Sequence, residues 1–257
     1  LSRAAQRLRR RHGVVLMVEL GDLREGIMPS DLEQTVRELL PLPNLVLKGI
    51  GTNLACRSGV TPDERNMAEL SALAEAIEAK FGLTLDIVSG GNSANLDWAL
   101  GNHASGRINN LRLGEAILLG CEPLRRQPIE GLHTDAITLV TEVIESKVKP
   151  SKPWGQLGQA AFGEKVTPVA CKGHITQVIL AIGEQDTDPR GLLPPAGIEF
   201  LGASGDHLIV DCSRGSQPVG SEIRFQLNYS AMVRAMTSPF VEKVMTTTDR
   251  GLMAGSG

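Results

Sequence analysis

The chain has 257 residues, and 26 Lys and Arg against 29 Asp and Glu give a formal net charge of -3 at pH 7. This small negative charge gives no reason to expect a nucleic acid or an anionic membrane as a partner, and an aromatic content of 3% leaves little stacking surface for sugars or unpaired bases. No apolar stretch is long enough to span a bilayer, and the cysteines and histidines lack metal-ligand spacing. We therefore expect a soluble cytoplasmic protein with reduced thiols and no metal.

The first part of the chain alternates strand and helix patterns. The sequence Ser30–Glu33 fits a capping box that opens a helix to Leu40, and Thr61–Glu64 fits a second one, whose helix ends before Gly82. Short apolar runs around these helices predict strands at 14–20, 45–50, 83–88 and 108–113. This order, with short polar joints, predicts four parallel βα units.

The second part consists of short β-type runs separated by Gly and Pro turns. They predict strands at 137–144, 166–170, 175–182, 198–200, 207–211 and 222–227. We therefore place a domain boundary at residues 121–131, which gives an α/β domain at 1–125, an all-β domain at 126–243 and a flexible tail at 244–257.

Two turns of the α/β part have the composition of an anion site. Arg112 lies near the end of the strand predicted at 108–113 and Gly114 follows it, and Ser93 follows another predicted strand at a helix start. Backbone N–H groups at a glycine turn or a helix start can bind phosphate. The alternatives are a buried strand with an ion-paired Arg112 and a helix cap at Ser93. In an α/β barrel both turns would lie on the C-terminal face, where ligands bind.

Five motifs carry a family resemblance: LGDLREG at 20–26, GIGTNLAC at 49–56, SGGNSANL at 89–96, NNLRLGE at 109–115 and GASGDH at 202–207. Together they resemble the ornithine racemase branch of the alanine racemase family. The resemblance implies pyridoxal phosphate as cofactor, a homodimer, and a TIM-type (β/α)8 barrel followed by a β domain. Only four βα units precede the β domain here, so we expect the C-terminal half of the barrel, with the first half and its Schiff-base lysine outside this sequence.

The resemblance also assigns site residues. Arg112 matches the arginine that contacts the pyridine nitrogen, and Arg24 matches the arginine near the substrate carboxylate. Asn53 stands where alanine racemases have a histidine packed on the cofactor ring. The phosphate-binding positions match Ser93, Gly114 and Glu115. Lys48 is the only lysine on a predicted barrel strand, and alternation points it to the face opposite Asn53.

The second catalytic base is a departure from the family pattern. In alanine racemase it is a tyrosine followed by glycine, whereas the matching pair here is Trp154-Gly155, and an indole N–H cannot act as a base. The candidates in the resembling motifs are Asp206, His207 and Cys56. The alternatives are an ordinary β-turn at Asp206-His207 and a small buried side chain at Cys56.

The sequence thus predicts a pyridoxal-phosphate-dependent amino-acid racemase, acting on ornithine or a related amino acid by two-base transfer of the α-proton. This chain alone is expected to be an inactive fragment. The alternative is a non-catalytic pyridoxal-phosphate carrier or regulatory protein, against which Arg24 and the β domain argue. Acidic residues suited to a substrate ammonium group remain unranked: Glu19, Asp22, Glu25 and Glu115.

Overall fold

The computed structural model describes residues 1–101, 104–159 and 172–246. The chain divides into two compact units, the first spanning Leu1–Ala136 and the second beginning at Ile137. Each unit is described by itself below. The strand predicted at 166–170 and residues 247–257 of the predicted tail lie outside the described residues.

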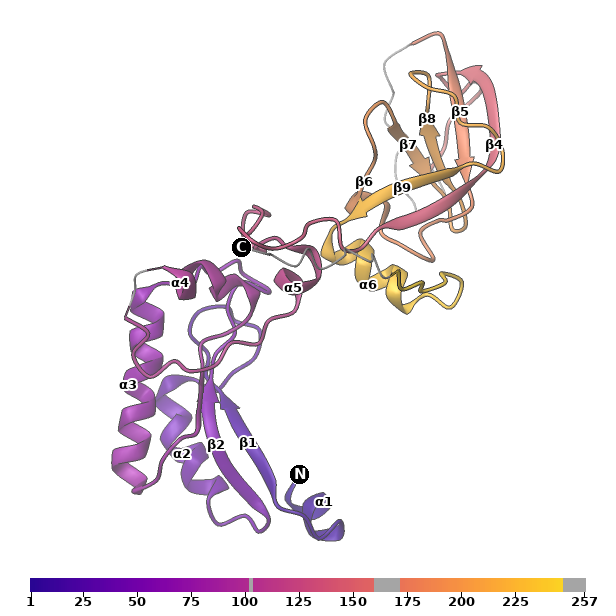
Figure 1. Ribbon diagram of the computed structural model, residues 1–257. Coiled ribbons are helices and arrows are strands. Elements are labelled where there is room, and N and C mark those ends of the chain that lie inside the picture. Colours follow the sequence, from indigo (N-terminus) through magenta and orange to yellow (C-terminus); the bar gives the residue numbers. More distant parts are fainter. Residues whose placement is uncertain (102–103, 160–171, 247–257) are drawn as a thin grey trace, which may run out of the picture. The chain divides into compact units, whose positions relative to one another are not determined.

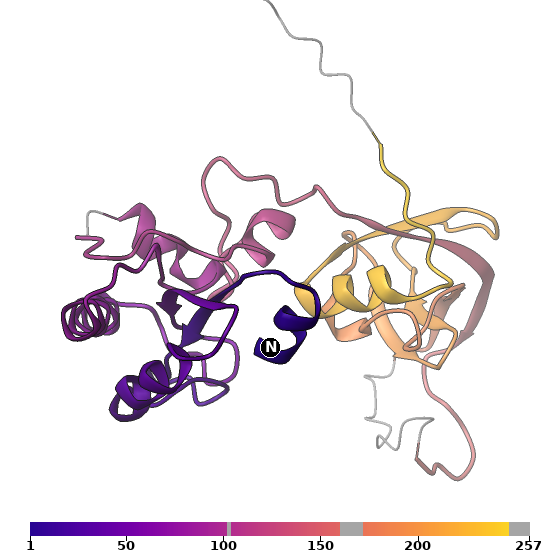
Figure 2. The ribbon, with the colours of Figure 1, turned by 90° about the horizontal axis from the view of Figure 1, so that it is seen from below.

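The first unit is built on a three-stranded parallel sheet in the order β1-β2-β3. Its strands are β1 (His12–Met17), β2 (Leu45–Gly51) and β3 (Ile87–Ser89). Helices α2 (Pro29–Leu39) and α3 (Glu64–Phe81) connect them and lie side by side on one face of the sheet (Figures 1 and 2). The prediction of parallel βα units is confirmed for these three strands.

The core of the first unit lies between this sheet and its two helices. Apolar residues of α2 and α3 pack against the sheet residues Leu47, Ile50 and Val88. Val36, Leu70 and Ala74 are fully buried on the helix side, which matches the spacing of an amphipathic helix. This packing holds the three strands in register, so the loops that leave their carboxyl ends share one edge.

Both long helices of this unit begin at positions different from those predicted. Helix α3 starts after Asp63, which forms a capping box with Asn66, and not after Thr61. Helix α2 starts with Pro29 and has no side-chain cap, so the capping box predicted at Ser30 is wrong. A proline at the first helical position needs no N–H partner. The predicted end at Gly82 is confirmed, since this residue adopts a φ of 62° that favours glycine.

The predicted fourth strand at 108–113 is wrong as a regular strand. The segment runs beside β3, but only Ser89 and Asn110 form a parallel bridge. The cause is Asn109, whose side-chain amide accepts from Val88 N–H at 2.9 Å and donates to the Asp86 carbonyl at 3.0 Å. An asparagine side chain that takes these backbone groups replaces the ladder that a strand would form.

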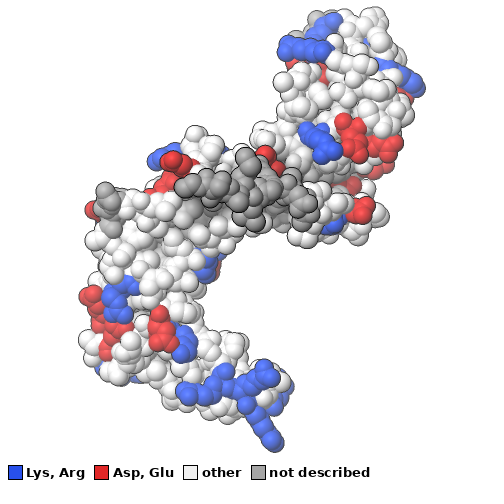
Figure 3. Space-filling model, in the orientation of Figure 1, with Lys and Arg blue, Asp and Glu red and all other residues white. Residues whose placement is uncertain are grey.

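Short helices complete the first unit. Near the N-terminus α1 (Ser2–Arg7) precedes β1, and η1 (Ser93–Asn95) leads into α4 (Leu96–Leu100) after β3. Helix α5 (Glu115–Leu119) follows the irregular segment. Figure 3 shows Lys and Arg side chains gathered at the N-terminal end, where the exposed residues are Arg3, Arg7, Arg9, Arg10 and Arg11.

The second unit contains a six-stranded antiparallel sheet in the order β6-β9-β4-β5-β8-β7. Its core includes the fully buried Phe225, which stacks on Phe200 with ring centroids 5.8 Å apart. The strands are β4 (Leu139–Pro150), β5 (His174–Leu180), β6 (Leu192–Leu193), β7 (Glu199–Ala203), β8 (Leu208–Asp211) and β9 (Glu222–Leu227). The 3-10 turn η2 (Pro189–Gly191) precedes β6.

The prediction that this unit is all-β is wrong in one element, helix α6 (Tyr229–Thr237). Its N-cap is Asn228, whose side chain accepts from Ala231 N–H at 3.0 Å. The cap follows β9 directly, so no polar turn separates the strand pattern from the helical one. A search of the described helices for one long and apolar enough to cross a membrane finds none.

Candidate active site

The site is built from loops that leave the carboxyl ends of β1, β2 and β3. At its centre is Arg112, whose guanidinium donates to Ser89 Oγ at 2.6 Å and to the Thr52 carbonyl at 2.9 Å. A third, longer bond of 3.4 Å reaches Asn53 Oδ1. Thr52 and Asn53 follow β2 and Ser89 ends β3, so one arginine ties the ends of two neighbouring strands together.

The charges around Arg112 show which side chains share the site. Burial lowers the pKa of its guanidinium, and the positive charge of Arg24 acts in the same direction. Glu25 and Cys56 raise the pKa of Arg112 in opposition. Residues from two separate loops, those after β1 and β2, therefore lie within electrostatic reach of one guanidinium. An incompletely solvated arginine favours an anionic or electron-rich partner.

A second cluster joins the turn after β3 to the start of helix α5. The Ser93 hydroxyl accepts from the backbone N–H groups of Gly114 and Ala116, both at 3.1 Å. Ser93 does not cap its own short helix, since Asn92 does so by accepting from Ala94 N–H at 2.8 Å. A Cβ added at Gly114 would meet nothing within 4 Å. The space beside the Gly114 Cα is therefore open, whereas Ser93 and Ala116 are buried.

Asn92 links the β3 turn to the loop after β2. Its Nδ2 donates to the Leu54 carbonyl at 2.8 Å, to Asn53 Oδ1 at 3.1 Å and to Cys56 Sγ at 3.2 Å. Asn53 is buried, whereas Cys56 is exposed and carries a free thiol. The alternative of a small buried side chain at Cys56 is therefore wrong.

A buried carboxylate connects the loop after β1 to the loop after β2. Asp22 is 1% exposed and accepts from the backbone N–H of Ser58 at 2.9 Å and of Arg57 at 3.1 Å. The Ser58 hydroxyl in turn donates a hydrogen bond of 2.6 Å to the backbone carbonyl of Asp22. This places the loop that carries Arg24 against the loop that carries Cys56.

Arg24 forms an exposed two-bond ion pair with the neighbouring Glu25, with one contact of 2.6 Å. The hydrogen bond with Glu25 raises the pKa of Arg24, and the same bond lowers the pKa of Glu25. Glu115 is paired in turn with Arg126, and Glu19 accepts from Gly21 N–H at 2.5 Å. All four acidic residues left unranked by the sequence therefore have protein partners.

The two lysines of the first unit lie away from this cluster. Lys48 pairs with Asp86 at 2.6 Å, and Lys80 pairs with Glu33 at 2.6 Å. Both are exposed ion pairs. Lys48 thus occupies the surface position expected from strand alternation.

Comparison with known proteins shows the family of the chain. The family model described as "Alanine racemase, N-terminal domain" matches residues 1–123. An ornithine racemase of Acetoanaerobium sticklandii is 42% identical over 247 residues, which cover 95% of this chain and 70% of that protein. The chain belongs to the alanine racemase family.

Two further relatives extend this family assignment. A lysine racemase of Thermotoga maritima is 40% identical over 243 residues, covering 93% of this chain and 67% of that protein. The solved alanine racemase of Clostridium difficile has a TM-score of 0.59 at 18% identity, covering 92% of this chain and 63% of that one. The fold is therefore part of the alanine racemase-type TIM barrel followed by a β domain, and the chain spans about 63% of that solved structure.

Three residues at the centre of this racemase-family site were not singled out by sequence reasoning. Thr52, Ser89 and Asn92 lie inside the quoted motifs, yet only their neighbours Asn53 and Ser93 were named. Their positions could have identified them, because each of the three residues ends or follows a buried strand whose carboxyl end faces the site. The neighbouring glycine Gly51 gives the same indication. A Cβ there would lie 2.9 Å from the Ser89 side chain, so the glycine leaves room for Ser89.

The candidate bases of the second unit lie on the turn between β7 and β8. Ser204 Oγ donates to Asp206 Oδ1 at 3.1 Å, and His207 Nδ1 lies 3.2 Å from the same oxygen. Trp154, at the position of the family's tyrosine, is 83% exposed, and Tyr229 begins helix α6. The structure thus pairs Asp206 with His207 and brings Arg24, Asn53, Cys56 and Arg112 together separately in the first unit.

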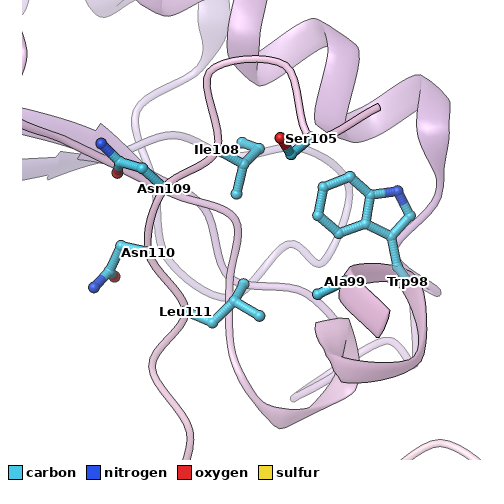
Figure 4. A pocket seen from close by; sticks show the side chains of 7 residues that line it. All are labelled: Trp98, Ala99, Ser105, Ile108, Asn109, Asn110 and Leu111. Carbon is cyan, nitrogen blue, oxygen red and sulfur yellow. The ribbon is translucent and has the colours of Figure 1, made fainter. Parts of the chain in front are cut away.

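A hollow of about 290 Å³ lies between helix α4 and the segment at 108–111 (Figure 4). Trp98, Ile108 and Leu111 give it a largely apolar lining, and no titratable side chain is among the described residues that line it. The charged and titratable side chains of the first unit's candidate site lie instead in the loops around Arg112.

Proposed function

We propose that this protein acts as a pyridoxal-phosphate-dependent amino-acid racemase on a diamino acid such as ornithine or lysine. The proposal is supported by the names of the two relatives, which are 42% and 40% identical to this chain. The single observation that carries it is Arg112, which meets the ends of β2 and β3 exactly where barrel loops bind ligands.

The residues around Arg112 fit the proposed cofactor. A phosphate dianion requires several N–H or O–H donors in a small space. Ser93 supplies a hydroxyl there whose oxygen is held by the backbone N–H groups of Gly114 and Ala116, which leaves its hydrogen to donate, and the space beside Gly114 is open. Glu115 adds its own backbone at the first residue of α5, while its carboxylate is neutralised by Arg126.

When bound, the cofactor would withdraw electrons from the α-carbon of an attached amino acid and so acidify its α-proton. Arg112 sets the strength of this effect, because a guanidinium has donors only. Arg112 would therefore leave the ring nitrogen of a bound cofactor unprotonated, which would make the ring a weaker electron sink. This favours proton exchange at the α-carbon over decarboxylation.

Substrate orientation is assigned to Arg24. A planar guanidinium can hold both oxygens of an α-carboxylate, and Arg24 already makes this type of contact with Glu25. The exposed ion pair between neighbouring residues contributes little to stability. A substrate carboxylate can therefore displace Glu25 at small cost.

The proton-transfer groups are assigned as candidates from both units. Cys56 is exposed, and Asn92 Nδ2 donates to its Sγ at 3.2 Å. Asp206 and His207 form a pair on the β7–β8 turn. Each can remove or return a proton at the α-carbon if its acid form and base form are both accessible near neutral pH.

We further propose that this chain alone is inactive and binds the cofactor without a covalent link. Lys48 and Lys80 are the only lysines before Ala136, and both are held in surface ion pairs. By resemblance, we also propose a homodimer, which light scattering of the full-length gene product would test.

Proton exchange tests the function. The full-length gene product with pyridoxal phosphate is incubated in deuterium oxide with L-ornithine, L-lysine or L-alanine. The proposal predicts loss of the α-proton signal and appearance of the D-enantiomer on a chiral column, with the diamino acids preferred. Cofactor binding without exchange of any amino acid would instead support the non-catalytic carrier.

A further inference from the structure

The amide nitrogen of Asn53 is a buried donor without an acceptor. The side chain follows β2 and the residue is 8% exposed. Its Nδ2 atom has no hydrogen-bond partner among the described residues. Buried polar groups are nearly always paired, and an unpaired one costs folding free energy. Such an atom beside a candidate cofactor site points to a ligand.

The orientation of this amide follows from its neighbours. The backbone N–H of Ala94 donates to Asn92 Oδ1 at 2.8 Å, so the Nδ2 atom of Asn92 must be on its other side. That nitrogen donates to Asn53 at 3.1 Å and to the Leu54 carbonyl at 2.8 Å. Because a donor faces it, Asn53 must present its oxygen to Asn92.

Arg112 imposes the same orientation from a second direction. Its guanidinium has donors only, and its NH2 atom lies 3.4 Å from Asn53 Oδ1. Turning the Asn53 amide around would place its N–H groups against two other donors. The oxygen of Asn53 is therefore committed to Asn92 and Arg112, and its nitrogen is left without an acceptor among the described residues.

We infer that Asn53 is a ligand-binding donor, whose Nδ2 donates a hydrogen bond to an oxygen of the bound molecule next to Arg112. The inference rests on the proposed function and specifies the role of one atom in it. An oxygen with negative charge fits best, because the nearby guanidinium is positive. The two sources of such an oxygen are the cofactor ring and the carboxylate of the amino acid.

This role differs from the one implied by resemblance. A histidine at this position would pack on the cofactor ring, whereas an asparagine amide offers little stacking surface. Asn53 is instead anchored at its oxygen and donates from its nitrogen. The binding contribution is therefore expected to depend on the donor, and not on the size of the side chain.

The substitution Asn53→Asp separates the two ends of the side chain. A carboxylate of the same shape keeps an acceptor for Asn92 and Arg112 but loses the donor. The free energy of unfolding of the unliganded protein should stay the same or rise. Affinity for pyridoxamine phosphate, which forms no covalent link to a lysine, should fall about tenfold or more. A merely structural role would lower both quantities together.

The added negative charge needs its own control. Asn110→Asp adds the same charge on the exposed segment two residues before Arg112. The backbone of Asn110 bridges Ser89, but its side chain has no hydrogen bond to the proposed site among the described residues. Asn110→Asp should lower affinity less than Asn53→Asp does. Repeating the Asn110→Asp titration at about 1 M salt, where interactions between exposed charges are largely screened, should remove the smaller effect of that variant. Asn53→His, which can both accept and donate, should restore most of the affinity.

A second probe distinguishes the two sources of the oxygen. The reduced adduct of pyridoxal phosphate with ornithine contains the cofactor ring and the amino acid in one molecule. Loss of affinity of Asn53→Asp for both probes places the oxygen on the cofactor, and loss for the adduct alone places it on the amino acid. Equal affinity of Asn53→Asp and the unmodified protein for both probes would overturn the inference. If the unmodified protein binds neither probe, the proposed function itself has failed.

Discussion

The hydroxyl of Ser93 accepts a hydrogen bond of 3.1 Å from the backbone N–H of Gly114, which is 21 residues further along the chain. The contact joins the turn after β3 to the first turn of α5. It gathers a hydroxyl and backbone N–H groups at one point, which is the composition that phosphate recognition requires. In this account Ser93 has two functions, since it closes the turn in the free protein and contacts phosphate in the bound one.

Ser93→Ala should therefore lower both stability and affinity. Loss of a side-chain acceptor at a helix start costs about 0.5–2 kcal/mol, so the midpoint of urea unfolding should fall accordingly. Affinity for pyridoxamine phosphate should also fall, as measured by fluorescence titration. Ser30→Ala is the control, because the Ser30 hydroxyl contacts only Asp31, and it should change neither value. An unchanged affinity in Ser93→Ala would contradict the phosphate assignment.

Arg112→Lys should weaken cofactor binding despite keeping the positive charge. A single ammonium cannot reproduce the fork that joins Ser89 and the Thr52 carbonyl. We expect affinity for pyridoxamine phosphate to fall about tenfold or more, equivalent to about 1.4 kcal/mol. Arg37→Lys, on the outer face of α2 in an exposed pair with Glu33, is the control and should bind like the unmodified protein. If Arg112→Lys and Arg37→Lys bound pyridoxamine phosphate with equal affinity, Arg112 would not be a cofactor-binding residue.

Asp22→Ala should loosen the loop that carries Cys56. Two backbone N–H groups would lose a buried acceptor, which costs about 1–3 kcal/mol in unfolding free energy. The rate of Cys56 alkylation by iodoacetamide, followed by mass spectrometry of its peptide, should rise several-fold. Asp186→Ala removes the 2.6 Å bond from the Ser238 hydroxyl in the second unit. It should cost stability while leaving the Cys56 rate unchanged.

Glu78 should give the first unit an acid-sensitive contribution to stability. A hydrogen bond from Arg107, and next the backbone N–H of Leu85, lower the pKa of Glu78 from 4.5 to about 2. A carboxylate with a lowered pKa in the folded state stabilises above its unfolded value and loses this effect as pH falls. The stability gap between the unmodified protein and Glu78→Gln should be constant above pH 4.5 and close as the pH approaches about 2. A gap that widened on acidification would contradict the assignment.

Regular elements with strong local signals were predictable from the sequence. Strands β1 and β2, helix α3 and its end at Gly82 follow from apolar periodicity and from the conformational preference of glycine. The segment at 108–113 has a strand-like apolar pattern as well, but the Asn109 side chain occupies the Val88 and Asp86 backbone groups. This competition between the Asn109 side chain and strand pairing involves Val88, 21 residues earlier in the chain. The local sequence pattern at 108–113 therefore cannot predict it.

The candidate site was predictable in its residue types but not in its connections. Motif resemblance pointed to Arg112, Ser93 and Asn53, and the structure brings them to one edge of the sheet. The role of Asn92 as a hub could not be read from the sequence, because it depends on the loop after β2 meeting the turn after β3. The unpaired amide of Asn53 could be recognised only once both of its oxygen's partners were known.

The spectrum of bound pyridoxal phosphate tests the central claim most directly. Pyridoxal phosphate is titrated into this chain and into the full-length gene product, with absorption spectra and protein masses recorded before and after borohydride. We expect saturable binding to both, with the reducible band and the mass increase confined to the full-length product, and weaker binding by Arg112→Lys in each. If neither protein bound pyridoxal phosphate saturably, the result would contradict the proposed cofactor site.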